Sequence, residues 1–405
     1  MLSYDDAVSH ILSSIQPLPS MLVPLEFSPK KILSDDLIAP FSLPRFDNSQ
    51  MDGYAVIAAD FQSVSAEAPV RLKVVSEVQA GSQEKGRIQS GQCSRIFTGA
   101  PLPEGADSVI AQEDVSRQAD VIVVVSSVEQ GQFVRLHGED IEQGGVAIRA
   151  RTQIRPYEIS LMAAFGMDSV NVGSFPRIAI ISTGNELVAT GNEKIGEFQV
   201  YDSNSTTLDA LIAREGAGIV HAGMAEDSQA ETEVALKSIR HSPDLIITCG
   251  GVSVGDYDYI RPAVLALGGT LDFIQVAIRP GKPTVFGNLN GIPFFGLPGN
   301  PVSAMITFEL FVRPAILRTA GYPVERCCRP MIDAILSSEI GHEPGRKTFA
   351  RGKVEFADAT IRVTPGNRQR SDQVSGMSGS DALIVIPEDV KTLAAESKVK
   401  VMLLD

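Results

Sequence analysis

The hydrophobic positions near the start of the chain repeat with the spacing of one helix face. Ser3 is placed to cap such a helix and Pro17 to end it. Further prolines up to residue 44 leave room for only one other short helix, over residues 30–37. The pattern therefore predicts one amphipathic helix followed by mainly extended chain. The apolar positions at i, i+3, i+4 and i+7 are Val8, Ile11, Leu12 and Ile15.

Beyond residue 45 the pattern changes to short β-type runs. Runs at residues 54–58, 70–75 and 120–125 are separated by Gly and Pro turns and show no long helical period. This predicts a β-rich domain over residues 46–140. Residues 1–45 together with 141–174 are expected to form an elongated N-terminal domain, with a helix that starts at Pro156.

From residue 175 to 322, apolar strands alternate with amphipathic helices. The strand at residues 177–182 is almost wholly apolar, as is typical of a strand covered on both faces, and a further strand is expected at residues 244–248. This alternation predicts a three-layer, mostly parallel α/β domain. A β pattern returns over residues 323–405 and predicts a C-terminal β-barrel domain. The expected fold class is a multidomain, elongated α/β plus β protein, in which β-rich domains flank the α/β domain.

The net charge of the chain limits the classes of partner that it is expected to bind. Lys and Arg number 35 and Asp and Glu 49, which gives a formal net charge of −14. Such a chain repels nucleic acid and anionic membranes, and no apolar run approaches the ~20 residues of a spanning helix. Two of the four cysteines are adjacent, and no CxxC spacing is present. We therefore expect a cytoplasmic protein without nucleic-acid or membrane partners.

Three loops of the α/β domain follow its predicted strands, where parallel sheets bind ligands. They cover residues 183–186, 249–258 and 297–303. In the third loop, Asn300 suits a helix N-cap and Pro301 the first helical position, so backbone N–H groups would face an anion. Each loop alone also fits an ordinary tight turn, but three at one sheet edge favour a ligand site. The candidate ligand-binding positions are Gly250, Gly251, Ser253, Pro298, Gly299, Asn300 and Ser303.

Carboxylates stand in or near the same loops. Glu186, Asp227 and Asp258 offer hard oxygen ligands with few His or Cys nearby, which favours Mg²⁺ over zinc. Helix capping is an equally good explanation for Asp227. Opposing charge comes from Arg279 and Lys282 in the sequence RPGKP, whose prolines stiffen a loop that is suited to oxyanions. A plain surface loop is the alternative.

Two other regions carry candidates of lower specificity. Asp52 and Thr98 stand in Gly- or Pro-containing segments that, taken alone, fit ordinary turns. Arg351 belongs to a basic cluster in the last domain, for which a solvated surface is the simpler explanation. No Ser/His/Asp set, paired cysteine nucleophile, Walker motif or Rossmann motif is present. The sequence therefore favours chemistry by positioning and electrostatics.

Taken together, six segments resemble the molybdopterin molybdenumtransferase family, the MoeA-like group that includes the E domain of gephyrin. In chain order they read DNSQMDGYAV, RIFTGAPLPEGADSVIAQEDV, ISTGNELV, GGVSVGDYDYI, IRPGKPTVFG and LPGNPVSAMITFELFVRPAI. The resemblance implies a transferase that inserts molybdate into adenylylated molybdopterin with release of AMP, using a divalent cation, usually Mg²⁺. It also implies an α/β domain of the molybdopterin-binding type.

The resemblance further implies partners and residue roles. Family members are homodimers whose active cleft lies between the α/β domain of one subunit and the β-rich domain of the other; a transient contact with the molybdopterin adenylyltransferase is also expected. The implied catalytic residues are Asp52, Thr98, Glu186, Asp227 and Asp258, of which the last three are the implied metal ligands. The implied cofactor-binding side chains outside the glycine-rich turns are Arg279, Lys282, Arg351 and Ser371.

Two alternative functions remain open at this point. One is adenylylation of molybdopterin, whose enzymes carry a shorter GGTG-type loop where this chain has GGVSVGDYD. The other is a non-enzymatic scaffold, as gephyrin partly is, although the sequence shows no long linker of the kind that such a role suggests. A molybdate-dependent assay separates these classes.

Overall fold

The computed structural model describes residues 1–239, 241–252, 258–357 and 360–404. The chain divides into two compact units, and each is described by itself. The first comprises Met1–Ser34, Arg151–Arg155 and Ser169–Asp405, and the second comprises Asp35–Ala150 and Pro156–Asp168. The finer division into four domains stays a prediction.

The first unit contains a six-stranded sheet in the order β16-β13-β17-β21-β20-β18. The strands are β13 (Arg177–Thr183), β16 (Gly218–Ala225), β17 (Leu245–Cys249), β18 (Thr270–Phe273), β20 (Val285–Leu289) and β21 (Ile292–Leu297). The first four in the order run parallel; β20 pairs antiparallel with β21, and β18 pairs antiparallel with β20 at the edge. The predicted mostly parallel sheet is thus confirmed, with β20 as a strand that the sequence analysis did not predict.

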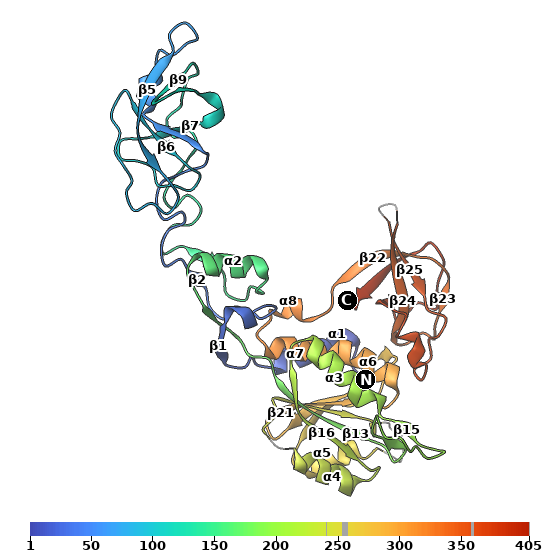
Figure 1. Cartoon of the computed structure of the whole chain (residues 1–405). Helices are drawn as coiled ribbons and strands as arrows, with labels where there is room; N and C mark the ends of the chain where they lie inside the picture. Colours follow the sequence, from blue (N-terminus) through green and yellow to red (C-terminus); the bar gives the residue numbers. More distant parts are fainter. Residues whose placement is uncertain (240, 253–257, 358–359, 405) are drawn as a thin grey trace. The chain divides into compact units, whose positions relative to one another are not determined.

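Helices cover both faces of this sheet (Figure 1). One face carries α1 (Tyr4–Ser14), α3 (Ser203–Arg214), α6 (Pro301–Thr307), the π-helix η4 (Phe308–Val312) and α7 (Arg313–Thr319). The other face carries α4 (Gln229–Ser238) and α5 (Ile260–Ala266). Along β13, Ile178 and Ile180 enter the first core, and Ala179 and Ile181 enter the second. Because both faces are covered, nearly every position of the strand is apolar.

The N-terminal segment confirms one predicted helix and contradicts the other. In α1, the Ser3 hydroxyl accepts the Asp6 N–H at 3.1 Å, which is the predicted cap. The prediction of a helix over residues 30–37 is wrong. Leu33 donates its N–H to Thr152 O at 2.9 Å, and Ile154 donates to Lys31 O at 2.8 Å. A distant segment thus supplies the hydrogen bonds that hold this stretch extended.

The C-terminal part of the first unit is a closed five-stranded barrel, as predicted. Its strands are β22 (Met331–Leu336), β24 (Lys347–Ala357), β25 (Thr360–Pro365), β26 (Ala382–Ile386) and β28 (Lys398–Leu403). The barrel closes because β24 pairs with both β25 and β26. The two-residue strand β19 (Ile278–Arg279) pairs with the start of β24 and links the α/β region to the barrel.

The second unit is built around a β-rich sheet, as predicted, in the order β7-β4-β6-β5-β9-β8. These strands are β4 (Gly53–Val56), β5 (Val70–Val78), β6 (Gln92–Ile96), β7 (Ser108–Ala111), β8 (Ser116–Gln118) and β9 (Val121–Val124). Tyr54, Leu72 and Ile122 form part of its buried core. The unit also contains α2 (Pro156–Ala164), which begins at the predicted proline.

Short elements complete the part of the chain that the structure describes. The remaining strands are β1 (Ser20–Pro24), β2 (Leu37–Ile38), β3 (Asn48–Ser49), β10 (Val134–Arg135), β11 (Val146–Ile148), β12 (Ser169–Gly173), β14 (Leu187–Val188), β15 (Val200–Tyr201), β23 (Ile340–Gly341) and β27 (Thr392–Leu393). The remaining helical turns are η1 (Leu25–Phe27), η2 (Ala58–Phe61), η3 (Gln112–Asp114), α8 (Val324–Cys327) and η5 (Val374–Gly376). Within the described ranges, none of the helices has the length and apolar character needed to cross a membrane.

Candidate functional site

Asp52 and Thr98 lie side by side at one end of the sheet of the second unit. Asp52 stands directly before β4 and Thr98 two residues after β6, and these strands are antiparallel neighbours with Gly53 opposite Ile96. Asp52 Oδ1 accepts both the backbone N–H and the hydroxyl of Thr98, each at 2.8 Å. The structure therefore joins two predicted catalytic residues that are 46 positions apart.

The hydrogen bonds from Thr98 stabilise the ionised carboxylate of Asp52. The Thr98 backbone N–H lowers the pKa of Asp52 most, followed by the Thr98 hydroxyl, and Arg95 contributes attraction. Arg95 is itself held over the rings of Tyr54 and Phe97, at 4.9 and 5.2 Å from their centroids. The second unit thus presents a fixed, negatively charged acceptor at neutral pH.

Thr98→Val is expected to raise the pKa of Asp52, because the hydroxyl donor is lost. The pKa should stay below that of an ordinary aspartate, since the backbone donor remains. A depressed carboxyl pKa contributes stability above the unfolded-state pKa, and this contribution is lost as the pH falls through the folded-state pKa. The variant should therefore lose it at a higher pH than the parent. NMR titration of the Asp52 carboxyl carbon measures the shift, and an unchanged pKa would contradict the assignment.

In the first unit, the loop after β13 is tied to the loop after β16. Asn185 donates its backbone N–H to Asp227 Oδ2 at 3.3 Å, and its side-chain oxygen accepts the Asp227 N–H at 2.9 Å. The Glu186 carboxylate lies over Gly184, with its oxygens 2.8 and 2.9 Å from where a Gly184 Cβ would stand. Because β13 and β16 are parallel neighbours, Glu186 and Asp227 stand on linked loops at one sheet edge.

Close packing explains the glycines that follow β17. Gly250 has a φ of 97°, and a Cβ there would lie 2.5 Å from the Thr183 carbonyl oxygen. The Gly250 N–H donates to Leu297 O at 3.0 Å, and a Cβ on Gly299 would lie 3.4 Å from the Gly250 Cα. Gly251 also has a positive φ, of 62°. The loops after β13, β17 and β21 therefore pack together at one edge, as the sequence analysis expected.

The Asp258 carboxylate forms an ion pair with a neighbouring arginine. Its side chain is 3% exposed and forms an ion pair with the Arg261 guanidinium, and its Oδ1 accepts the Arg261 N–H at 3.4 Å. Burial raises the pKa of Asp258, and the bonds from Arg261 oppose that shift. A cation at this carboxylate would have to displace Arg261. Ser253, also predicted in this loop, lies outside the described residues.

The three predicted metal ligands follow neighbouring strands but do not form a closed cage. In the described part of the chain, no three His, Cys, Asp or Glu side chains are placed to hold a metal ion. Mg²⁺ is usually held by one or two carboxylates together with substrate phosphates and water. Glu186 and Asp227, on their linked loops, fit a cation that binds together with an anionic substrate.

A pocket of about 590 Å³ lies between the RPGKP loop, α6 and the barrel. β19 carries Arg279 to the barrel by pairing with β24. Gly281 has a φ of 102°, and a Cβ there would lie 2.3 Å from Thr307 Cγ2, so this turn requires glycine. Six predicted ligand-binding residues line the pocket: Arg279, Lys282, Pro298, Asn300, Ser303 and Ser371. The structure brings them together, and their ligand stays a prediction.

Ser371 joins the barrel to the start of α6. The Asn300 side chain donates to Ser371 Oγ at 3.0 Å, and the Val302 N–H donates to Ser371 O at 3.2 Å. Asn300 occupies the predicted N-cap position, but its side chain makes no cap hydrogen bond to the helix. The reason is that its amide reaches the barrel loop instead. The backbone N–H of Val302, at the helix start that was expected to face an anion, is therefore bonded to Ser371 within the protein.

Arg351 is buried beneath the loop of residues 368–371, part of which lines the pocket. It is 1% exposed and is not among the residues that line the pocket. Its Nε donates to Arg368 O at 2.9 Å, and its Nη2 donates to Arg370 O at 3.2 Å. Gln369 also bonds the Arg351 backbone, at 3.0 and 2.8 Å. Arg351 thus fixes the loop that carries Ser371, and its predicted contact with the cofactor stays a prediction.

Sequence reasoning did not select Arg346 and Arg370, which also line the pocket. Both belong to the basic cluster for which a solvated surface was the simpler explanation. His342 lines the same pocket, with its Nδ1 3.0 Å from Thr348 Oγ1. The sequence did show a concentration of basic residues in an otherwise acidic chain. That Arg346 and Arg370 meet at this pocket depends on how the barrel closes, which the sequence did not show.

Together, the glycine-rich sheet edge and the basic pocket are typical of the class of α/β proteins that bind anionic, phosphate-bearing small molecules. Comparison with known families specifies that class. The chain matches "MoeA N-terminal region (domain I and II)" at residues 2–166, "Probable molybdopterin binding domain" at 179–318 and "MoeA C-terminal region (domain IV)" at 333–404. The chain belongs to the MoeA family.

Relatives match over nearly the whole chain. "Molybdopterin molybdenumtransferase 2" of Mycobacterium tuberculosis is 33% identical over 97% of this chain and 96% of its own length. "Molybdopterin molybdenumtransferase" of Haemophilus influenzae is 34% identical over 99% of this chain and 98% of its own length. The crystal structure of the molybdopterin biosynthesis MoeA protein from Pyrococcus horikosii superimposes with a TM-score of 0.86 and 32% identity, over 100% of this chain and 99% of that one. These matches confirm the resemblance drawn from the six sequence segments.

Proposed function

We propose that this chain is a molybdopterin molybdenumtransferase, which inserts molybdate into adenylylated molybdopterin with release of AMP in molybdenum cofactor biosynthesis. The pocket between the RPGKP loop, α6 and the barrel is the observation that carries this proposal. Its guanidinium and ammonium groups suit phosphate and oxyanion ligands, which this substrate pair supplies. The names of the relatives agree with this function.

The chemistry that we propose depends on positioning and electrostatics, without a covalent enzyme intermediate. Arg279 and Lys282 bind the anionic substrates, and Ser371 helps to orient them. Asp52, ionised through its bonds from Thr98, serves as a fixed acceptor for a proton-bearing group. Glu186 and Asp227, with Asp258 once released by Arg261, would hold Mg²⁺, which when bound neutralises phosphate charge.

The assay that tests the proposal uses purified protein, adenylylated molybdopterin, MgCl₂ and molybdate, and measures released AMP and pterin-bound molybdenum. AMP release that requires molybdate supports the transferase. Consumption of ATP with unmodified molybdopterin would identify an adenylyltransferase instead. Absence of both reactions would favour a scaffold and overturn the proposal.

We further propose that the working form is a cytoplasmic homodimer, which makes a transient contact with the molybdopterin adenylyltransferase. The family resemblance supports this proposal. Mixing two impaired variants, Asp52→Asn and Lys282→Ala, at a low substrate concentration where neither alone has much activity, tests whether the two groups of residues act from different subunits. Recovery of part of the activity after subunit exchange supports shared sites, and a mixture that stays inactive, with exchange verified, contradicts them.

Lys282→Ala is expected to weaken binding of the pterin nucleotide by roughly tenfold or more, because a hydrogen bond to a charged group contributes about 1.5–3 kcal/mol. The melting temperature should change little, since Lys282 lies in a half-buried loop at the pocket. Lys353→Ala is the matched control, because Lys353 is exposed on the barrel and does not line the pocket. Isothermal titration measures both affinities, and equal values would contradict a clamp role for Lys282.

A further inference from the structure

A second polar pocket of about 690 Å³ lies in the first unit and shares no lining residue with the first pocket. Its walls come from the N-terminal segment, the ends of α3 and α7, and the α8–β22 connection. Five cationic side chains line it: Lys30, Arg214, Arg313, Arg326 and Arg329. None of the proposed catalytic or substrate-binding residues is among its lining.

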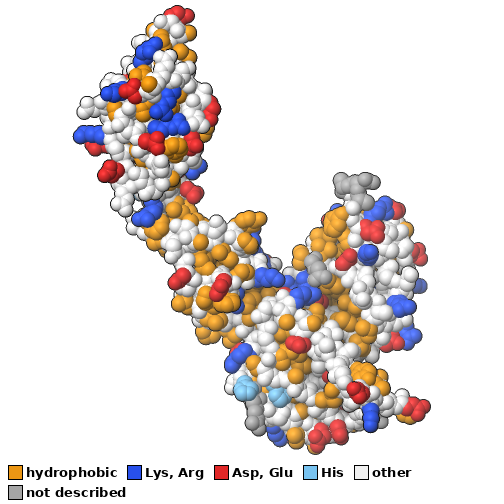
Figure 2. All heavy atoms as spheres, in the orientation of Figure 1, with side chains coloured by type: hydrophobic (Ala, Val, Ile, Leu, Met, Phe, Trp, Pro, Cys, Tyr) orange, Lys and Arg blue, Asp and Glu red, His pale blue; other side chains and the backbone are white. Residues whose placement is uncertain are grey.

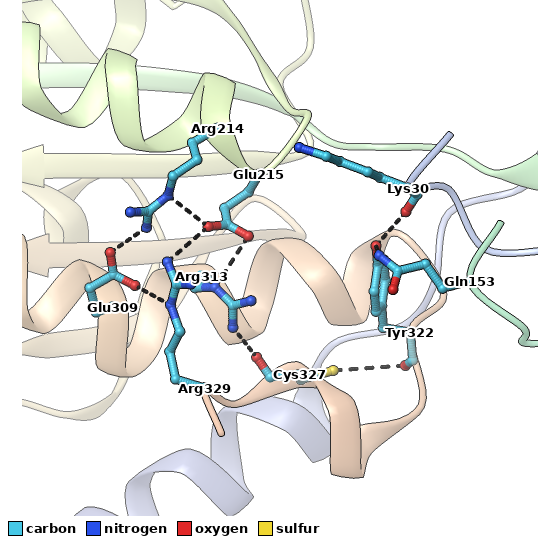
Figure 3. A network of polar contacts seen from close by, with 9 residues as sticks. All are labelled: Lys30, Gln153, Arg214, Glu215, Glu309, Arg313, Tyr322, Cys327 and Arg329. Carbon is cyan, nitrogen blue, oxygen red and sulfur yellow. Dashed lines mark hydrogen bonds and ion pairs between the residues drawn. The ribbon is translucent and has the colours of Figure 1, made fainter. Parts of the chain in front are cut away.

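The wall of this pocket is a network of arginines around two buried glutamates (Figure 3). Glu215 Oε1 lies 3.1 Å from Arg214 Nε and 3.3 Å from Arg329 Nη2, and Glu215 Oε2 lies 3.2 Å from Arg313 Nε. Glu309 Oε2 lies 2.9 Å from Arg329 Nε, and Glu309 Oε1 forms an ion pair with Arg214. The side chains of Glu215 and Glu309 are only 9% and 4% exposed.

Positive charge exceeds negative charge in this network. Three guanidinium groups share two carboxylates, and the side chains of Arg313 and Arg329 are 12% and 10% exposed. A largely buried charge without a full counter-charge is costly, so the network is poised to accept an anion. Burial lowers the pKa of Arg313, in keeping with this incomplete compensation.

The Arg313 guanidinium is held by an ion pair and a backbone hydrogen bond. Arg313 Nε is buried and makes no hydrogen bond of good geometry, although it lies 3.2 Å from a Glu215 oxygen. Arg313 Nη1 donates to Cys327 O at 2.9 Å, which fixes the guanidinium plane at the pocket wall.

Flexible cations stand at the rim of the pocket. Lys30 and Arg326 are both exposed and line it, with Glu325 as the one acidic lining residue beside Glu215 among those described. Figure 2 shows Lys and Arg side chains gathered beside α8. In a chain with a net charge of −14, five cations around one pocket are a local reversal of charge. Leu317 and Met331 add apolar wall for the organic part of a ligand.

We propose that this pocket is a second ligand site, which binds a small phosphate-bearing molecule through Arg313, Arg326, Arg329 and Lys30. Planar guanidinium groups that are held in place by glutamates match the oxygens of a phosphate, and the exposed cations at the rim add positive charge beside it. The volume lies within the range of small-molecule sites. Because the walls come from four separate segments (residue 30, residue 153, residues 214–215 and residues 313–331), the bound molecule ties these segments together and stabilises the fold.

Pyrophosphate is the probe for this site, applied to the full-length protein at constant ionic strength set with NaCl. Pyrophosphate can also enter the first pocket, so every measurement is made in a Lys282→Ala background. There, titration calorimetry is expected to show saturable binding, and saturating pyrophosphate should raise the melting temperature by about 2 °C or more. Adding Lys30→Gln and Arg326→Gln, two exposed positions that leave the buried network intact, should weaken binding at least about tenfold.

The matched control carries Lys73→Gln and Arg71→Gln, two exposed cations of β5 in the second unit, and should bind like the Lys282→Ala background. Three results would overturn the proposal: no saturable binding in the Lys282→Ala background, equal affinity after the Lys30 and Arg326 changes, or an equal loss in the control. Because neither molybdate nor a pterin enters the experiment, its outcome is independent of the proposed enzymatic function.

Discussion

Replacement of Asp52 by asparagine is expected to reduce molybdate insertion at least about a hundredfold while the protein remains folded. Asparagine preserves the size of the side chain, and its oxygen can still accept the bonds from Thr98 that hold Asp52 at 2.8 Å. The negative charge is lost, and loss of one preorganised electrostatic contact to a transition state costs about 10²–10³ in rate. Steady-state AMP release measures the effect, and a thermal melt confirms the fold.

Asp60→Asn supplies the matched control in the same unit. Asp60 is also a surface carboxylate that accepts a hydroxyl and a backbone N–H, from Ser90 at 2.6 Å and Gly91 at 2.9 Å. The two substitutions therefore remove the same charge from similar hydrogen-bonded settings. If Asp52→Asn retains activity, or if both variants lose it equally, Asp52 has no special role in the reaction. If Asp52→Asn unfolds while Asp60→Asn stays folded, the role of Asp52 is structural.

Glu309→Ala is expected to lower the free energy of unfolding by about 3–5 kcal/mol, because it leaves buried guanidinium groups without their counter-charge. The Glu309 side chain is 4% exposed and pairs with Arg214 and Arg329. It projects from η4, in the middle of the long helix that packs on the sheet. Urea denaturation followed by circular dichroism measures the loss.

Glu396→Ala is the comparison for Glu309→Ala. Glu396 also pairs with an arginine, through two bonds of 2.8 and 2.9 Å to Arg362, but both side chains are exposed. Solvent screens such a pair, so its removal should have little effect on stability. A similar loss for the two variants would mean that burial of the network does not determine its contribution, which contradicts the argument.

The helices and strands that could be predicted from the sequence are those whose own side-chain pattern determines the backbone conformation. The spacing of Val8, Ile11 and Leu12 required one helix face, and the apolar run of β13 required cover on both faces. The unpredicted strand β20 had a local signal as well, because Asn290-Gly291 joins it to β21 in a hairpin. Residues 30–37 had no such signal, since their hydrogen-bond partners come from residues 152–154 and beyond.

The site residues divide in the same way. The motifs indicated Arg279, Lys282 and Asn300, because stiff basic turns and helix starts suit anions wherever they lie. The bond from the Asn300 side chain to Ser371 and the burial of Arg351 behind the loop were not predictable, since both depend on how the barrel closes. The arginine network around Glu215 joins residues up to 115 positions apart, and no motif marks it.

By itself, the sequence determined the helix and strand types, the turns that demand glycine or proline, and membership of the MoeA family, because these depend on local sterics and on the order of short motifs. Only the tertiary structure decided which polar side chains meet: Asp52 with Thr98, and the arginines with their two glutamates. The physical reason is that electrostatic and hydrogen-bond energies depend on distance and burial. Both quantities are set by chain segments far apart in the sequence, once the sheets and the barrel have closed.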